Sequence, residues 1–230
     1  MNPQPGRTPR LMLAGGGSEI DSAPLDRIFA GWTGPGGRML YLPIALDPEQ
    51  SSYASALSWV RSVFEPLGVR DITMWGDLRA HGGEELQSFD SVYIGGGNTF
   101  RLLSLLRESG FDRHLAGYFH GGGAIYGGSA GAIVMGGNIY TASHLDPNEV
   151  ALTETRGLNL ARGHSIWCHY MAEDDPLVFD YVQRYRFPVL ALSERSGVAV
   201  EGDRMTAHGY EPVLRFTATR KHTIQPGNGV

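Results

Sequence analysis

Ser129 lies in the stretch Tyr126-Gly127-Gly128-Ser129-Ala130-Gly131, where glycines flank the serine on both sides. An apolar run precedes this stretch and a short helical pattern follows it, which is the strand–turn–helix context that a G-x-S-x-G motif requires. The glycines allow a strained turn that leaves the serine hydroxyl uncovered, and the helix N-terminus favours negative charge nearby. The pattern predicts a nucleophilic serine; the alternative is an ordinary glycine-rich turn with a capping serine.

A nucleophilic serine needs a general base, because its hydroxyl is almost wholly protonated near neutral pH. Five histidines follow Ser129 in the chain: His144, His164, His169, His208 and His222. His169 ends an apolar segment, so its ring is expected to reach Ser129 across the carboxyl ends of the strands. The alternative for each histidine is a surface position or a hydrogen-bonded position in the core. We predict that His169 is the base.

The base in turn needs a carboxylate that fixes its tautomer and stabilises the imidazolium. Glu194 follows the apolar run Val189–Leu192 at the same ends of the strands, and it is the expected orienting group. Asp174 and Asp175 are alternatives, although their position favours a role as acids in the first turn of the next helix. Glu194 also has a simpler interpretation, as a solvated turn residue paired with Arg195.

An oxyanion hole needs backbone N–H groups that face the developing negative charge. Ala130, directly after the serine, supplies one such group. The second is expected from Gly95-Gly96-Gly97-Asn98, which closes the neighbouring strand. His120-Gly121-Gly122-Gly123 has the form of a lipase-type oxyanion motif, but it leads straight into the strand that carries Ser129. Too little chain remains for it to cross to a neighbouring strand, so a turn is predicted there.

Other motifs do not support a nucleotide, metal or thiol site. Gly15-Gly16-Gly17 does not continue as G-x-G-x-x-G, and GGGNTF lacks the lysine of a P-loop. No histidine spacing is typical of zinc, although His164, His169 and Glu173 form the set to check. Cys168 precedes His169 in a predicted strand, so their side chains are expected on opposite faces and not as a dyad. The sequence predicts no cofactor and no metal.

Short apolar runs alternate with helical patterns along most of the chain. The predicted strands are Leu11–Ala14, Arg38–Pro43, Val69–Trp75, Ser91–Ile94, Ala124–Tyr126, Ser165–Tyr170 and Val189–Leu192. The predicted helices are Pro24–Trp32, Tyr53–Leu67, Thr99–Arg107, Phe111–His120, a short one after Ser129, and one around Pro176–Arg184. Residues 137–163 are polar and irregular, as in an active-site loop or a small hairpin.

Strand–helix alternation of this kind predicts a single α/β domain of 230 residues, with a mostly parallel sheet covered by helices on both faces. In such sheets ligands bind at the carboxyl ends of the strands, and the candidate residues follow predicted strands. Residues 1–9 and 221–230 are expected to be frayed. An antiparallel extension is expected at the C-terminal end, from Gly197–Val200, Arg204–Ala207 and Val213–Phe216.

The bulk composition limits the class of protein. The formal net charge is −5 and no long basic run occurs, which argues against nucleic acid or an anionic membrane as a partner. The single cysteine, Cys168, excludes an intrachain disulfide framework and favours a reducing compartment. No apolar run approaches the ~20 residues of a membrane span, and the polar N-terminal segment differs from a secretory signal. A soluble, cytoplasmic protein is expected.

Two motifs together resemble the dipeptidase E and cyanophycinase family of serine peptidases. They are Ile94-GGGNTF-Arg101-Leu102-Leu103 and Tyr126-GGSAGA, at a spacing that the family shares. The similarity covers most of the chain, while the N-terminal third matches only in pattern. Its further segments are Asp146-Pro147-Asn148, Gly157-Leu158, Cys168-His169-Tyr170 and Ala191-Leu192-Ser193-Glu194.

The resemblance implies a fold like the class I glutamine amidotransferase domain, with serine in place of cysteine at the elbow. It implies peptidase activity on small peptides and is compatible with a homodimer. The triad that it implies is Ser129, His169 and Glu194, with Gly97 beside Ala130 as the second oxyanion donor. The substrate contacts expected with it are Gly96, Asn98 and His144.

The chain departs from the family at two places that bear on specificity. Ser143-His144 stands where dipeptidase E proteins carry an Asn-Asp pair. Ala172-Glu173-Asp174-Asp175 replaces a longer, Arg-bearing segment that is associated with recognition of an N-terminal aspartate. If the acidic segment lines the substrate pocket, it repels an aspartyl side chain. We therefore expect strict specificity for Asp-X dipeptides to be absent.

Overall fold

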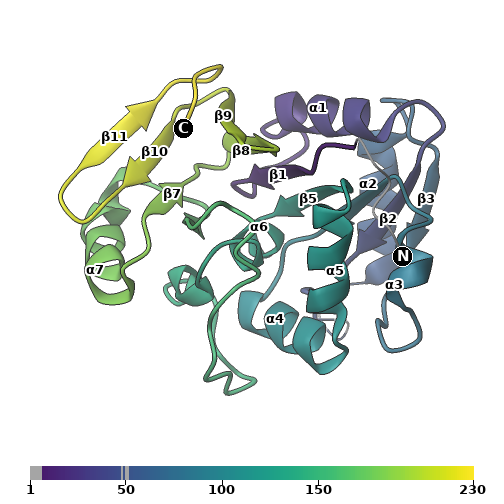
Figure 1. Ribbon diagram of the computed structural model, residues 1–230, viewed down its shortest axis with the longest axis horizontal. Helices are drawn as coiled ribbons and strands as arrows, with labels where there is room; N and C mark the ends of the chain where they lie inside the picture. The colour runs from purple at the N-terminus through teal and green to yellow at the C-terminus, as the bar shows by residue number, and fades with distance from the viewer. Residues whose placement is uncertain (1–6, 48, 50–51) are drawn as a thin grey trace.

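The computed structural model describes residues 7–47, 49 and 52–230, which form two β-sheets with helices packed around them (Figure 1). The larger sheet contains β1 (Arg10–Ala14), β2 (Arg38–Leu42), β3 (Asp71–Met74), β4 (Ser91–Ile94), β5 (Ala124–Gly128), β8 (Ser196–Glu201) and β9 (Arg204–Gly209). The smaller sheet contains β6 (Ser165–Trp167), β7 (Val189–Ala191), β10 (Val213–Phe216) and β11 (Lys221–Ile224).

The helices are α1 (Ala23–Thr33), α2 (Tyr53–Phe64), α3 (Gly83–Leu86), α4 (Thr99–Glu108), α5 (Phe111–His120), α6 (Ala130–Val134) and α7 (Asp175–Tyr185), with short 3-10 helices η1 (Ile139–Ala142) and η2 (Ala172–Asp174). Of these, α3 and both 3-10 helices were absent from the sequence prediction. Across the part of the chain that the structure describes, no helix has the length and apolarity needed to cross a membrane.

The larger sheet has the strand order β3-β2-β4-β5-β1-β8-β9. The first five of these strands are parallel, and β8 and β9 are antiparallel to their neighbours. Helices α1 and α2 pack on one face, and α4, α5 and α6 pack on the other. The parallel strands are therefore apolar on both sides, and the predicted mostly parallel α/β sheet is confirmed.

The smaller sheet, in the order β11-β10-β7-β6, carries α7 on one face and lies beside the larger sheet (Figure 1). Alternation of strands and helices does not distinguish the two sheets. Strand β8 pairs with the edge of β1, while β6 pairs with β7 and β7 pairs with β10. The predicted antiparallel extension is accordingly divided, with β8 and β9 in the larger sheet and β10 in the smaller one.

The C-terminal segment 221–230 is ordered, so the expectation of a frayed tail is wrong. Strand β11 pairs with β10, and the N–H of Val230 donates to the carbonyl oxygen of Met205 at 3.0 Å. The ammonium group of Lys221 lies 2.5 Å from the carboxylate of Asp175. The polar composition suggested fraying, but main-chain pairing and an ion pair need no apolar side chains. Residues 1–6 of the other predicted frayed end lie outside the described residues.

Candidate active site

Ser129 occupies the turn between β5 and α6, at the carboxyl end of the central parallel strands. Its backbone has φ 50° and ψ −114°, and a positive φ is uncommon for a residue other than glycine. Its N–H donates to the carbonyl oxygen of Ala14 at 3.1 Å. A Cβ on Gly127 would overlap the carbonyl of Gly131, and one on Gly131 would overlap that of Ile94. The elbow that the sequence predicts is therefore built on close backbone packing.

His169 follows β6 and approaches Ser129 from the smaller sheet. Its Nε2 lies 2.8 Å from Ser129 Oγ, within hydrogen-bond distance. Its φ is 52°, so the chain has left the strand before the histidine, and its main-chain N–H donates to the carbonyl oxygen of Gly15 at 3.0 Å. Main-chain hydrogen bonds to the end of β1 thus hold both residues of the pair.

Glu194 follows β7, the strand beside β6 in the smaller sheet. Its Oε1 lies 3.2 Å from Nδ1 of His169, so the three residues form a continuous chain of contacts. The Glu194 side chain is 58% exposed, and its carboxylate therefore remains solvated. The interpretation of Glu194 as only a turn residue paired with Arg195 finds no support, because the guanidinium of Arg195 pairs with Asp21 and Glu211.

The acidic segment after the histidine turns away from this chain of contacts. Asp174 accepts hydrogen bonds from the main-chain N–H of Met171 at 2.9 Å and from the indole of Trp167 at 3.3 Å. Asp175 pairs with Lys221. Neither aspartate borders a cavity at the serine. The condition that the acidic segment lines the substrate pocket is therefore not met by these two carboxylates, since local donors and a cation engage them.

The three glycines after β1, Gly15–Gly17, pack against the candidate triad. In the sequence analysis they were considered only as a nucleotide-binding turn. Gly16 has φ +108°, and a Cβ there would overlap the His169 ring and lie 3.0 Å from Ser129 Cβ. A Cβ on Gly17 would overlap the main-chain carbonyl of Glu194. The available signal was three glycines directly after a strand. The side chains against which they pack belong to distant segments, so sequence reasoning missed this role.

Two sets of backbone N–H groups lie beside Ser129. Ala130 begins α6, so its N–H has no partner within that helix. The loop after β4 also comes close, because a Cβ on Gly96 would lie 3.8 Å from Ser129 Oγ. The amides of Gly96 and Gly97 donate no hydrogen bond to another described residue. Unpaired donors are therefore present in both segments from which an oxyanion hole was predicted.

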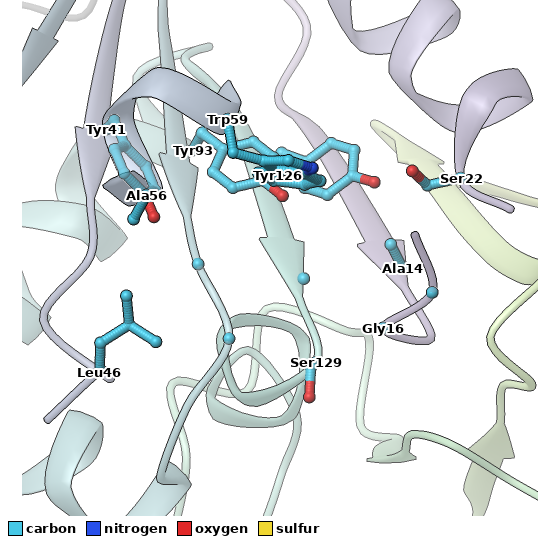
Figure 2. Close-up of a pocket in the computed structure, with 14 residues that line it drawn as sticks. Ala14, Gly16, Ser22, Tyr41, Leu46, Ala56, Trp59, Tyr93, Tyr126 and Ser129 are labelled. Atoms are coloured by element: carbon cyan, nitrogen blue, oxygen red, sulfur yellow. The ribbon is translucent and has the colours of Figure 1, made fainter. Parts of the chain in front are cut away.

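Ser129 borders two cavities. The first, of about 270 Å³, is lined mainly by aromatic residues and glycines (Figure 2). The second, of about 240 Å³, has a mixed lining, in which His169, His144 and Asp146 stand beside apolar side chains and Gly97. No cluster of three or more His, Cys, Asp or Glu side chains able to hold a metal ion lies among residues 7–47, 49 and 52–230. The histidine and carboxylate side chains beside the serine thus border the second cavity and not the first.

The three predicted substrate contacts differ in position. Gly96 lines the first cavity and His144, stacked on Trp167 with ring centroids 4.2 Å apart, borders the second. Asn98 borders neither. Its side-chain oxygen accepts the N–H of Arg101 at 2.9 Å and its nitrogen donates to the carbonyl of Pro147 at 2.8 Å. Asn98 therefore caps α4 and anchors the following loop, and its predicted contact with substrate is not supported.

Cys168 lies under the elbow and not beside the base. Its Sγ is 3.5 Å from the main-chain oxygen of Ser129 and 3.7 Å from that of Ala14. Burial raises the pKa of the Cys168 thiol well above its ordinary value, so the thiol stays protonated near neutral pH. The cysteine packs the nucleophile turn, as expected from the absence of a cysteine–histidine dyad.

Comparison of the sequence with known protein families identifies one family. Residues 11–208 match the model of Peptidase family S51. Peptidase E of Streptomyces coelicolor is 30% identical over 209 residues, which cover 84% of this chain and 82% of that protein. The match therefore extends over the segments that carry the serine, the histidine and the glutamate.

Two solved structures share the fold. A protein described as a peptidase E from Listeria monocytogenes EGD-e has a TM-score of 0.71 and 22% identity, over 89% of this chain and 100% of that chain. A peptidase from an acI-B1 actinobacterium has a TM-score of 0.72 and 17% identity, over 97% and 96% of the two chains. Together with the serine elbow and the family match, this likeness leads to one conclusion. The chain belongs to peptidase family S51 and is a serine-type peptidase.

Proposed function

We propose that this peptidase hydrolyses small peptides through a triad of Ser129, His169 and Glu194. The observation that chiefly supports the proposal is the 2.8 Å distance between Ser129 Oγ and His169 Nε2, in a turn whose backbone is held at a positive φ. Such a contact provides the base that a serine hydroxyl needs to act as a nucleophile.

In the proposed cycle, Nδ1–H of His169 donates to Glu194, which leaves Nε2 to accept the Ser129 proton. Ser129 Oγ attacks the peptide carbonyl carbon while its proton passes to Nε2. The imidazolium gives that proton to the amine nitrogen, the C–N bond breaks and an acyl ester on Ser129 remains. A water molecule, deprotonated by Nε2, then attacks the ester. The proton returns to Ser129 Oγ as the carboxylic acid product leaves.

The N–H groups of Ala130 and Gly97 are the proposed donors to the oxyanion of both tetrahedral intermediates. Ala130 lies at the N-terminus of α6, where backbone amides carry partial positive charge. Gly97 borders the same cavity as Ser129 and His169. Loss of one such donor typically lowers turnover by about 10²–10³.

The proposal of a small substrate is supported by the shape of the space at the serine. Each of the two cavities that Ser129 borders has the volume of one or two side chains, about 270 and 240 Å³. A dipeptide would fill both, with its scissile bond at Ser129.

Ser129→Ala tests the proposal, because it removes the nucleophilic hydroxyl and little packing. We expect dipeptide hydrolysis to fall by about 10⁴–10⁶ while the circular dichroism spectrum is unchanged. Ser58→Ala, a change of the same size at an exposed position of α2, serves as the control and should retain full activity.

A fluorophosphonate probe separates the proposed function from two alternatives, an amide or ester hydrolase with another substrate and a non-catalytic module that binds a metabolite. The binding module should not be labelled. We expect the wild type and Ser58→Ala to be labelled and Ser129→Ala to remain unlabelled. Labelling at Ser129 without hydrolysis of any dipeptide would indicate an amide or ester hydrolase with another substrate. Activity of Ser129→Ala within tenfold of the wild type would remove Ser129 from its role.

A further inference from the structure

The first cavity at Ser129 has an aromatic wall, and the hydroxyls of Tyr41 and Tyr93 lie close to the lining glycines Gly95 and Gly128. Ser129 lies at one end and the rings of Tyr41, Tyr93, Tyr126 and Trp59 gather at the other (Figure 2). Tyr93 and Tyr126 stack with ring centroids 4.7 Å apart, which fixes the wall that they form. Three of the rings come from neighbouring strands of the larger sheet and the fourth from α2. The aromatic end of the cavity is therefore built on the larger sheet and α2, while Leu46 and glycines of the adjoining turns complete the lining.

No charged side chain is among the described residues that line this cavity. Two carboxylates contact the wall from outside the cavity: buried Asp26 accepts hydrogen bonds from the hydroxyls of Tyr126 and Ser22, at 2.9 and 2.7 Å, and Glu19 accepts one from the indole of Trp59 at 3.1 Å. Placing a carboxylate in such a cavity leaves the charge unpaired and costs free energy. The lining therefore selects against an aspartyl side chain.

The volume of the cavity suits a large apolar side chain. An apolar cavity of about 150 Å³ is enough to hold a benzene molecule, and this cavity measures about 270 Å³. A phenyl or branched aliphatic group that enters it loses contact with water and gains aromatic neighbours. A methyl group, as in alanine, leaves most of the space unfilled.

The position of His169 indicates which residue of a bound dipeptide places its side chain in the first cavity. The leaving amine must lie next to His169, because that ring supplies its proton. His169 borders the second cavity and not the first. The leaving residue therefore points towards the second cavity, and the residue that supplies the scissile carbonyl has the first cavity for its side chain.

We propose that the cavity walled by Tyr41, Tyr93, Tyr126 and Trp59 is the subsite for the side chain of the acyl residue, and that it selects large apolar side chains. This inference rests on the proposed hydrolysis of small peptides at Ser129. It names the substrate class as dipeptides with an aromatic or large aliphatic first residue.

The test compares kcat/KM for Phe-Leu, Leu-Leu, Ala-Leu and Asp-Leu in one buffer. We expect Phe-Leu and Leu-Leu to exceed Ala-Leu and Asp-Leu by at least about tenfold, the discrimination that an apolar pocket provides for a few methylene groups. Equal values for all four substrates, or a preference for Asp-Leu, would overturn the proposal.

Ala56→Leu narrows the cavity from α2, and Leu46→Trp narrows it from the loop after β2. Each variant should lower kcat/KM for Phe-Leu at least tenfold more than for Ala-Leu. Ala54→Leu is the matched control, since Ala54 lies on the same helix, is exposed and does not line the cavity. It should leave the ratio of the two substrates unchanged.

A series of Leu-X dipeptides, in which only the second residue varies, shows whether the narrowed cavity binds the first or the second residue of the substrate. If the narrowed variants change the preference for the second residue and not for the first, the assignment to the acyl residue is wrong. If the wild type cleaves dipeptides but the narrowed variants keep its preferences, the cavity is not the subsite and the proposed function still stands. If the folded wild type cleaves no dipeptide, the proposed function fails, and the subsite with it.

Discussion

The carboxylate of Glu194 lies 3.2 Å from His169 Nδ1 and is more than half exposed to solvent. A carboxylate in this position fixes the histidine tautomer and stabilises the imidazolium. We therefore expect Glu194→Gln to lower kcat by about 10²–10⁴ while KM stays nearly constant. Steady-state kinetics with one dipeptide give both values.

Asp174→Asn and Asp175→Asn are the controls for this assignment. Their carboxylates contact Trp167, Met171 and Lys221 and do not line a cavity at the serine. Turnover should stay within a few-fold of the wild type in both variants. If one of them loses activity and Glu194→Gln does not, the orienting acid is one of these aspartates.

Asp26 is the buried carboxyl behind the aromatic cavity, and burial raises its pKa to about 6, against the hydrogen bonds from Ser22 and Tyr126. Below about pH 4 the group is protonated in both the folded and the unfolded chain and has no effect on stability. Above about pH 6 the folded chain holds a buried charge that the unfolded chain holds in water. Ionisation of Asp26 therefore destabilises the fold as the pH rises from about 4 to 6.

Asp26→Asn removes this ionisation. Relative to the wild type, the variant should gain about 3 kcal/mol in free energy of unfolding between pH 4 and pH 7, from a shift of about two pKa units. Urea denaturation at several pH values measures the difference. Asp180→Asn, at an exposed position of α7, should show no such gain. A constant difference between Asp26→Asn and the wild type would show that Asp26 titrates normally.

At the scale of elements, the turn after β1 positions Ser129 and His169. Its main-chain carbonyls accept their N–H groups, and Gly16 leaves room for the His169 ring because it has no side chain. A methyl group there would overlap the His169 ring. We expect Gly16→Ala to lower kcat at least about 100-fold, since small displacements of reacting groups have effects of this size. The variant should remain folded, because the overlap is confined to the site.

Gly68→Ala controls for backbone strain. Gly68 also has a positive φ, +95°, but a Cβ there would meet no atom within 4 Å. Its substitution should cost about 1–2 kcal/mol in stability without loss of activity. If Gly16→Ala retained wild-type turnover, the turn would have no part in placing His169.

The proximity of Ser129, His169 and Glu194 could be expected from the sequence because each follows an apolar run; their catalytic roles stay a prediction. The contacts of Gly16 and Asp174 were not predictable, since they depend on which distant segment packs against them.

The pairing of the strands was not predictable for the same reason, since it depends on contacts between distant segments. Alternation identified β6 and β7, but it could not show that β8 and not one of these strands pairs with β1, a contact between segments almost two hundred residues apart. Polar composition likewise failed to indicate β11, whose pairing uses main-chain atoms.

At the scale of the whole molecule, one apolar core joins the two sheets. Leu11 and Ile125 of the larger sheet share this cluster with Ile166, Leu190 and Val213 of the smaller one. We therefore propose that the chain unfolds as one domain. Differential scanning calorimetry should give a single transition with equal calorimetric and van't Hoff enthalpies. Two resolved transitions, or loss of the His169 environment before the parallel sheet melts, would indicate two units.

The position of β1 has a consequence for how the protein is made. Leu11 pairs with Ile125 on one side and with Val200 on the other, so β1 must wait for partners more than a hundred residues further along the chain. At about 5–20 residues per second, the ribosome needs roughly 10–40 s to deliver the second partner. Until then β1 has β5 as its neighbour on one edge and no partner on the other. The sheet whose carbonyls at Ala14 and Gly15 hold Ser129 and His169 is therefore completed only after β8 has been synthesised.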